Sequence, residues 1–259
     1  MPYFTHDGLE LYYEIEGQGF PVVLRTGGGG DSGMFREAGY VDGLDGYQRI
    51  LFDHRGRGRS QKPTRVDDYA IERHVADIVA LLDTLGLPLA IYWGYSGGAS
   101  VGFALAAANP ERIAAFIATG VIDDPDADAD EARDETIAYA EAVRAGGMQY
   151  LVDGYTAEAP MLPWFRDQML ATDPNVFADS LLAGLAWPGP WPLLARIACS
   201  TLLLVGERED PGGLNPRAAA EMPHARCVTF PGLNHIEAFE RSDLALPHVL
   251  TFLRDLRLG

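Results

Sequence analysis

Basic residues are scarce in this chain. Among its 259 residues, 37 aspartates and glutamates stand against 20 lysines and arginines, and Lys62 is the only lysine. The formal net charge of −17 repels phosphate backbones and anionic bilayers. We therefore expect neither nucleic acid nor a membrane surface among the partners of this protein.

Cysteine and long hydrophobic runs are also rare. Cys199 and Cys227 do not make a disulfide framework, and each stands at the start of an apolar run, where a small buried residue is typical. No stretch approaches the ~18 apolar residues of a membrane span, and the first residues lack the basic and apolar regions of a signal peptide. A chain of this length buries a sizeable core without disulfides or metals, so we expect a soluble, cytoplasmic globular protein.

Short apolar runs alternate with helical periodicity along most of the chain. The first twenty residues alternate in the manner of a β-hairpin, and apolar residues at helical spacing predict a helix over 71–85. Further helices are expected up to residue 109, near 216–221, and at the end of the chain up to residue 256. The runs that predict buried strands are 21–24, 49–52, 89–93, 113–121, 201–205 and 227–230. This order indicates an α/β fold with a mostly parallel sheet covered by helices on both faces.

The alternation stops between residues 123 and 196, where prolines and several helix-like pieces occur. We expect 1–122 and 197–259 to form the core, with 123–196 inserted as a helical cap over the carboxyl ends of the strands, where open α/β sheets bind ligands. Acidic residues crowd the start of this insertion in a spacing that partly matches a calcium loop. Ala129 stands where such a loop needs glycine, so we expect no metal there.

The pentapeptide Gly94-Tyr95-Ser96-Gly97-Gly98 lies between a predicted strand and a predicted helix. A serine at such a sharp turn adopts a strained backbone, and its neighbours two places away pack too closely for large side chains. The turn would expose the Ser96 hydroxyl and aim the Gly97 N–H at a developing oxyanion. Ser96 is therefore the candidate nucleophile.

A neutral serine needs an adjacent base that is oriented by a third group. His235 follows the last predicted strand and is expected at the same edge of the sheet as Ser96. Two acids, Glu209 and Asp210, follow the strand 201–205. Either could orient the imidazole, and the chain order serine, acid, histidine is that of α/β-hydrolases.

Over nearly its whole length the chain resembles the α/β-hydrolase superfamily. The resemblance rests on the glycine-rich turn 27–30, the loop Asp53-x-Arg-Gly-x-Gly-x-Ser60, the elbow at Ser96, and Pro-Gly-x-x-His235. It implies an α/β-hydrolase fold with a helical cap, and a second oxyanion donor in the backbone N–H of Gly28.

The family pattern bears on the acid as well. It usually places the acid three residues after the strand-end glycine, which gives Glu209, whereas residue type and the following proline favour Asp210. Some members take the acid from the preceding strand, where Asp123 and Asp124 stand. This chain also has Thr26 where the family usually has histidine, so the support behind the oxyanion turn must differ.

The expected activity is hydrolysis of carboxylic esters, including lactones, through an acyl-enzyme on Ser96. Carbon–carbon bond hydrolysis, perhydrolysis and acyl transfer would use the same triad, and a hydrolase-like ligand-binding protein without turnover is a further alternative. Tyr95, Trp164 and Trp187 are expected to line the substrate pocket. The acidic cap favours a neutral, hydrophobic small-molecule substrate, and we expect no cofactor.

Overall fold

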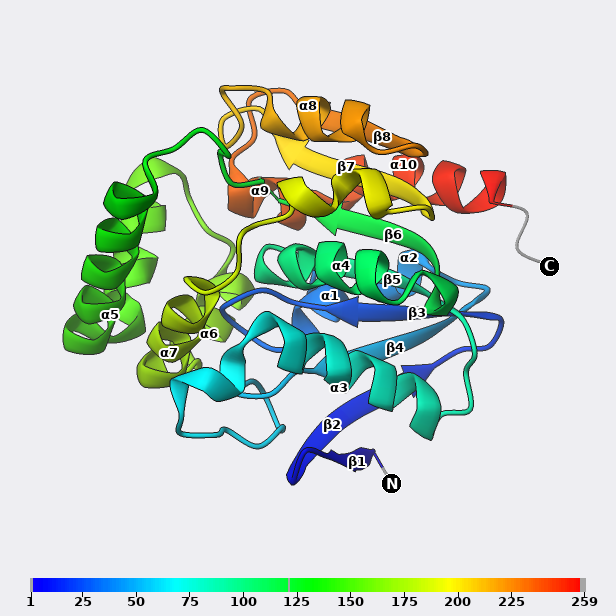
Figure 1. Ribbon diagram of the computed structural model, residues 1–259, viewed down its shortest axis with the longest axis horizontal. Helices are drawn as coiled ribbons and strands as arrows, with labels where there is room; N and C mark the ends of the chain where they lie inside the picture. The colour runs from blue at the N-terminus through cyan, green and yellow to red at the C-terminus, as the bar shows by residue number, and fades with distance from the viewer. Residues whose placement is uncertain (1, 121, 257–259) are drawn as a thin grey trace.

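A single sheet carries the fold, with its eight strands in the order β1-β2-β4-β3-β5-β6-β7-β8 (Figure 1). The computed structural model describes residues 2–120 and 122–256. Strands β1 and β2 form the predicted hairpin, β2 pairs antiparallel with β4, and all other pairs are parallel. The strands are β1 Tyr3–His6, β2 Leu9–Glu16, β3 Phe20–Arg25, β4 Tyr47–Asp53, β5 Ala90–Tyr95, β6 Ile113–Thr119, β7 Ser200–Gly206 and β8 Ala225–Phe230.

Every apolar run that predicted a strand forms one, which confirms the α/β class. The strand predicted over 113–121 ends at Thr119, and its last predicted residue, Val121, lies outside the described residues. Successive side chains of the central strands point to opposite faces, so both faces need cover. Val22 and Leu24 of β3 enter one buried cluster and Val23 enters the other.

Helices cover the two faces in separate groups (Figure 1). One group packs beside Val23, and it consists of α3 Ile71–Thr84, α4 Gly97–Ala108 and α8 Leu214–Glu221. The other packs beside Val22 and Leu24, and it consists of α1 Gly33–Glu37, α2 Tyr40–Gly43, α9 His235–Glu240 and α10 Ser242–Asp255. Short 3-10 helices are η1 Val66–Tyr69, η2 Pro110–Arg112 and η3 Trp191–Arg196. Helices α1, α2 and α9 were not anticipated, since each is too short to show a clear apolar period.

Three helices between β6 and β7 stand to one side of the sheet, at the left of Figure 1. They are α5 Ala129–Glu158, α6 Pro163–Leu170 and α7 Pro174–Gly184, called here the α5–α7 segment. Gly147 interrupts α5 with a left-handed φ of 67°. Buried residues of all three helices, such as Leu151, Phe165 and Phe177, join the cluster that contains Trp93 of the sheet. The segment is thus packed on the core by a continuous apolar contact.

None of the helices in the described ranges is both long and apolar enough to cross a bilayer.

Candidate active site

Ser96 lies between β5 and α4 in a backbone conformation that side chains rarely adopt. Its φ is 55° and its ψ is −124°, outside the regions that L-residues favour. Strain of this kind is typical of functional sites, where the surrounding structure holds it in place. The Ser96 N–H donates to the carbonyl of Thr119 at 2.8 Å, and α4 begins at once with Ala99 N–H donating to the Ser96 carbonyl at 2.7 Å. Both ends of the turn are fixed.

Glycines make this sharp turn possible. A Cβ on Gly94 would collide with the backbone of Gly98, and a Cβ on Gly98 would lie 2.6 Å from the carbonyl oxygen of Arg25. On the other side, a Cβ on Gly27 would lie 2.6 Å from Cβ of Ser96. Strand β3, strand β5 and helix α4 therefore meet around Ser96 with no room for a side chain at residues 27, 94 and 98.

His235 begins α9 and contacts the acid that follows β7. Its Nδ1 lies 2.5 Å from Oε2 of Glu209, whose side chain is only 7% exposed. The other oxygen of Glu209, Oε1, accepts a hydrogen bond from the Gly206 N–H at 2.9 Å. Both carboxylate oxygens are thus engaged, and one orientation of the imidazole is fixed.

Asp210 takes no part in this contact, which corrects its place among the candidate acids. Its Oδ1 accepts from the N–H of Leu214 at 2.6 Å and its Oδ2 from the N–H of Asn215 at 3.0 Å. The carboxylate therefore holds the first turn of α8, where negative charge is favourable. Of the two neighbouring acids, Glu209 has the longer side chain that points back to His235. The remoter candidates, Asp123 and Asp124, line the cavity without contacting His235.

Gly120 and Tyr95 also shape the site, in positions that the sequence pattern does not indicate. A Cβ on Gly120 would lie 3.1 Å from Cε1 of His235 and 3.4 Å from Cα of Ser96, so any side chain there would wedge between the two. The Tyr95 ring stacks on the His235 ring with centroids 5.0 Å apart, and its hydroxyl donates to the His235 carbonyl at 3.3 Å. Gly120 follows a strand directly and has a φ of 128°, but its place between serine and histidine requires the tertiary structure.

The glycine-rich turn after β3 brings Gly28 close to Gly97. A Cβ on Gly97 would lie 3.8 Å from the amide nitrogen of Gly28, so the two expected oxyanion donors are neighbours. The support for this turn comes from the loop after β4. His54 Nε2 lies 3.1 Å from the Gly27 carbonyl oxygen, and Arg57 Nε donates to the Gly28 carbonyl at 2.7 Å.

Thr26, in contrast, is fully buried with no partner for its hydroxyl among the described residues. The side-chain contacts to the carbonyls of this turn come instead from His54 and Arg57, in the loop after β4. Burial, together with the charges of Arg25 and Arg57, lowers the pKa of His54 well below its ordinary value. The neutral ring therefore donates to one carbonyl at a time, either that of Gly27 or that of Arg55.

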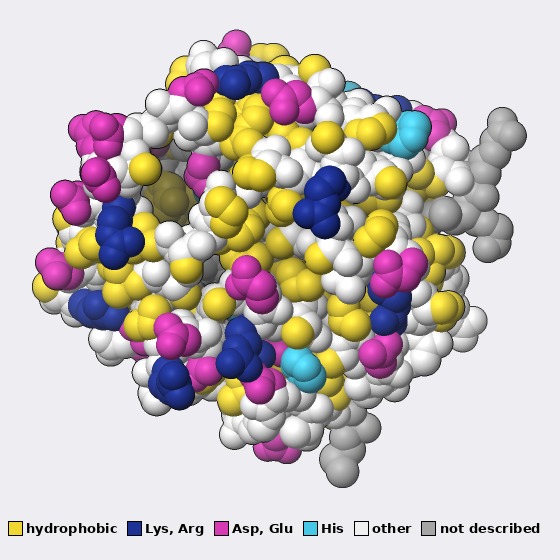
Figure 2. All heavy atoms as spheres, viewed as in Figure 1, with side chains coloured by type: hydrophobic (Ala, Val, Ile, Leu, Met, Phe, Trp, Pro, Cys, Tyr) yellow, Lys and Arg dark blue, Asp and Glu magenta, His cyan; other side chains and the backbone are white. Residues whose placement is uncertain are grey.

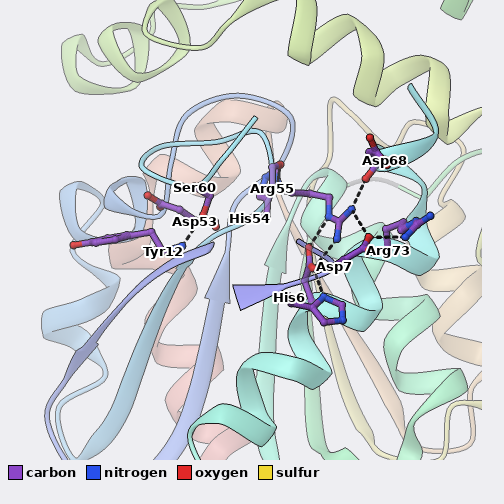
Figure 3. Close-up of polar contacts among 10 residues, drawn as sticks. His6, Asp7, Tyr12, Asp53, His54, Arg55, Ser60, Asp68 and Arg73 are labelled. Carbon is purple, nitrogen blue, oxygen red and sulfur yellow. Dashed lines mark hydrogen bonds and ion pairs between the residues drawn. The ribbon is translucent and has the colours of Figure 1, made fainter. Parts of the chain in front are cut away.

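The three arginines of this loop serve different ends, and Figure 3 shows the contacts of the first. Arg55 forms a two-point ion pair with Asp77, with both N–O distances 2.7 Å, and donates to the Asp68 carbonyl. Arg59 pairs with Glu14 at the surface. These two are structural, whereas Arg57 bonds the glycine-rich turn after β3 and lines the cavity.

A cavity of about 990 Å³ lies over Ser96 and His235. Figure 2 shows a hollow in the surface between α5 and the core, on the side where the strands of the sheet end. Tyr95 and Trp187 line the cavity as expected, together with Phe165 and Phe177 of the α5–α7 segment. Trp164 is not among the lining residues, and its ring lies 5.3 Å from that of Phe165 between centroids. Three acids line the cavity where α5 begins: Asp123, Asp124 and Asp130.

No group of three or more His, Cys, Asp or Glu side chains is arranged to hold a metal ion within residues 2–120 and 122–256. The reactive groups that the fold brings together are a hydroxyl, an imidazole, a carboxylate and two backbone N–H groups. Such a set is suited to acyl transfer through a serine.

Comparison with known proteins gives a consistent picture. Residues 21–149 match the sequence family described as "alpha/beta hydrolase fold". The zearalenone hydrolase of Cladophialophora bantiana is 39% identical over 111 residues, which are 42% of this chain and 42% of that protein. The putative carbamate hydrolase RutD of Azorhizobium caulinodans is 37% identical over 114 residues, 44% of this chain and 42% of that protein. The chain thus matches less than half the length of these curated relatives.

Solved structures match over nearly the whole chain. A thermophilic esterase from Thermogutta terrifontis superposes with a TM-score of 0.83 at 26% identity, covering 98% of this chain and 97% of the esterase. The enol-lactonase from Burkholderia xenovorans LB400 has a TM-score of 0.81 at 25% identity, covering 98% of this chain and all of the lactonase.

Proposed function

Since the chain belongs to the α/β-hydrolase superfamily, we propose that it is a serine hydrolase of carboxylic esters, including lactones. The observation that carries the proposal is the strained serine at residue 96, which lies in one cavity with a histidine that is oriented by a buried carboxylate. The likeness to an esterase and an enol-lactonase supports the same reaction class.

In this proposal Ser96 Oγ attacks the carbonyl carbon of the substrate while His235 takes its proton. The imidazolium then returns the proton to the leaving alcohol, and water releases the acyl group in the reverse sequence. Glu209 keeps Nδ1 protonated, so that Nε2 is free to act as the base, and stabilises the positive charge that forms on the ring. Tyr95 stacks against the other side of the histidine and limits its rotation.

The tetrahedral oxyanion would be held by the N–H groups of Gly28 and Gly97. Each such donor contributes roughly 3 kcal/mol of transition-state stabilisation because it is aimed in advance at the developing charge. The Gly28 N–H shares its peptide unit with the Gly27 carbonyl, which lies 3.1 Å from His54 Nε2, and the bond from Arg57 to the Gly28 carbonyl fixes the peptide unit that follows. We propose that these two contacts replace the support that residue 26 gives elsewhere in the family.

We propose further that residues 123–196 act as the cap. Phe165, Phe177 and Trp187 from this segment line the cavity and offer an apolar surface to an acyl or alcohol group. The cap would thus select a substrate with a hydrophobic part, while the sheet supplies the reacting groups.

The test combines covalent labelling with turnover. Wild-type protein is treated with a fluorophosphonate probe and assayed on p-nitrophenyl esters of increasing acyl length and on a series of lactones. Ser96→Ala should abolish labelling and lower turnover by ~10⁴-fold or more. Ser100→Ala is the matched control, since Ser100 lines the same cavity one turn further along α4, and it should label as wild type does.

Each result bears on the proposal. Turnover by Ser96→Ala near the wild-type rate would refute the assignment of the nucleophile. A wild-type protein that neither labels nor hydrolyses any ester or lactone would be a ligand-binding protein on this fold. Labelling of wild type without hydrolysis of any ester or lactone would indicate that the triad serves another reaction.

A further inference from the structure

One end of the cavity is lined by buried basic side chains that the proposed mechanism does not fully use. They come from the end of β3, the loop after β4 and helix α3, and their exposed fractions range from 1% to 5%. We call this set the arginine end of the cavity, and it consists of Arg25, His54, Arg57 and His74. It contrasts with the aromatic lining contributed by the α5–α7 segment.

No ion pair joins Arg25 or Arg57 to a carboxylate within the part of the chain that the structure describes. The contrast with Arg55 is direct, because that residue is equally buried and is paired with Asp77. Nε and Nη1 of Arg57 donate hydrogen bonds to the carbonyls of Gly28 and Gly56. It is therefore bonded, but its charge is not neutralised.

Arg25 has still fewer partners. Its Nη1 reaches the Thr26 carbonyl at 3.3 Å, and its Nε, buried, has no hydrogen-bond partner among the described residues. The phenol of Tyr92 lies beside it, and burial raises the pKa of that phenol to about 12, so Tyr92 offers no negative charge. The Nε and Nη groups of an arginine can together pair with a carboxylate through two parallel bonds.

The two histidines of the arginine end do not cancel its charge. Burial and the neighbouring arginines lower the pKa of both His54 and His74 well below the ordinary value, so both rings are neutral. Nδ1 of His74 is buried and, like Arg25 Nε, has no partner in the described chain. Two positive charges and two buried nitrogens without partners in the described chain, Arg25 Nε and His74 Nδ1, thus belong to side chains at this end of the cavity. A buried charge without a partner is costly, and an anionic ligand would offset that cost.

We propose that the arginine end binds a carboxylate of the substrate, with Arg25 as its main contact. The inference rests on the proposed hydrolase function and names its substrate class: esters or lactones that carry one carboxylate on an otherwise hydrophobic molecule. The sequence predicted a neutral substrate from the acidic residues of the cap. The proposed substrate differs because the basic side chains of the arginine end line the cavity itself. Asp123, Asp124 and Asp130 outnumber Arg133 at the acidic side of the cavity, so a single carboxylate suits the cavity better than a multiply charged anion.

The test compares two pairs of esters that differ only in charge. The first pair, p-nitrophenyl hydrogen glutarate and p-nitrophenyl 5-methylhexanoate, places a carboxylate or an isopropyl group on the acyl side. The second pair, 4-acetoxybenzoate and 4-isopropylphenyl acetate, does so on the alcohol side. The readout is the ratio of kcat/KM for the anionic ester to that for the neutral ester, because general damage to the enzyme cancels in this ratio.

Wild type should prefer the anionic member of at least one pair, and Arg25→Met should lower that ratio by at least tenfold. Arg49→Met is the matched control, since Arg49 is also buried with an unpartnered Nε but lies on β4 outside the cavity lining. It should leave the ratio unchanged. A wild-type preference for the neutral member of both pairs, or an equal loss of the ratio in both variants, would overturn the carboxylate site.

A binding measurement separates this proposal from the hydrolase proposal. Hexanoate, a monocarboxylate with an apolar chain, is titrated by calorimetry into Ser96→Ala protein, with and without Arg25→Met. Binding that disappears with Arg25→Met supports the carboxylate site even if no ester is hydrolysed. Ser96-dependent hydrolysis of neutral esters, with no preference for anionic esters and no hexanoate binding, would leave the hydrolase function standing and remove the site.

Discussion

Replacing Glu209 by glutamine tests how the acid orients the histidine. In the native protein the Gly206 N–H donates to Oε1 of Glu209, and Oε2 faces Nδ1 of His235. The N–H needs an acceptor, so it will hold the amide oxygen of glutamine and turn the amide NH₂ toward Nδ1. His235 must then accept at Nδ1 and carry its proton on Nε2, which removes the base from Ser96. We expect kcat/KM to fall by about 10³–10⁴-fold, equivalent to roughly 4–5.5 kcal/mol of barrier.

The matched variant is Asp210→Asn, one residue further along. Asp210 serves the first turn of α8, so this change should cost about 1 kcal/mol of stability, lower the melting temperature by roughly 2–4 °C, and keep kcat/KM within about threefold. Both variants are assayed on p-nitrophenyl butyrate, and their melting temperatures are measured by calorimetry. If Asp210→Asn loses turnover and Glu209→Gln keeps it, the reasoning about the two carboxylates is wrong.

Three further changes test the turn, its support and the buried histidines. Gly94→Ala forces a Cβ into the backbone of Gly98. The change should lower the free energy of unfolding by about 3 kcal/mol and the melting temperature by roughly 6–12 °C. An unchanged melting temperature would contradict the close approach of the two backbones. Arg57→Met removes the donor to the Gly28 carbonyl and should lower kcat about tenfold with little change in the fold. Ester kinetics measure kcat, and circular dichroism checks the fold. A kcat equal to that of wild type would show that Arg57 does not support oxyanion binding. The pKa of His74 is lowered by burial, so only the unfolded chain takes up its proton below about pH 6.5, and the free energy of unfolding should fall by up to ~1.4 kcal/mol per pH unit from this residue as the pH drops from 6.5 to 5.5. Urea unfolding of wild type and His74→Leu at these two pH values measures the difference, and equal slopes would show that His74 is protonated in the folded state.

Much of the fold follows from local pattern. The strands appear as apolar runs because a central parallel strand such as β3 is buried on both faces and tolerates few polar residues. The hairpin at the start alternates because it lies at the edge of the sheet. Short helices such as α1 and α9 escaped prediction, since five or six residues do not complete two turns of an apolar period.

The candidate site is also predictable from the sequence only in part. Ser96 is predictable because a strained turn needs glycines at fixed offsets, and these offsets are visible in the sequence. The choice between Glu209 and Asp210 is not, because both follow the same strand and only the direction of each side chain separates them. Trp164 was expected in the pocket on residue type alone, which does not tell which residues of α6 line the cavity; Phe165 does and Trp164 does not.

The sequence by itself determined the α/β class, the break in the strand–helix alternation between β6 and β7, and the serine turn with a histidine after the last strand. Each of these depends on residues close together in the chain or on the order of elements. Only the tertiary structure decided which carboxylate holds His235, what supports the oxyanion turn, and what charge lines the cavity. Those features bring together residues such as Arg25, Arg57 and His74 from separate strands, loops and helices. No local sequence pattern shows that these residues lie close together, because their proximity is set by how the sheet and its helices pack.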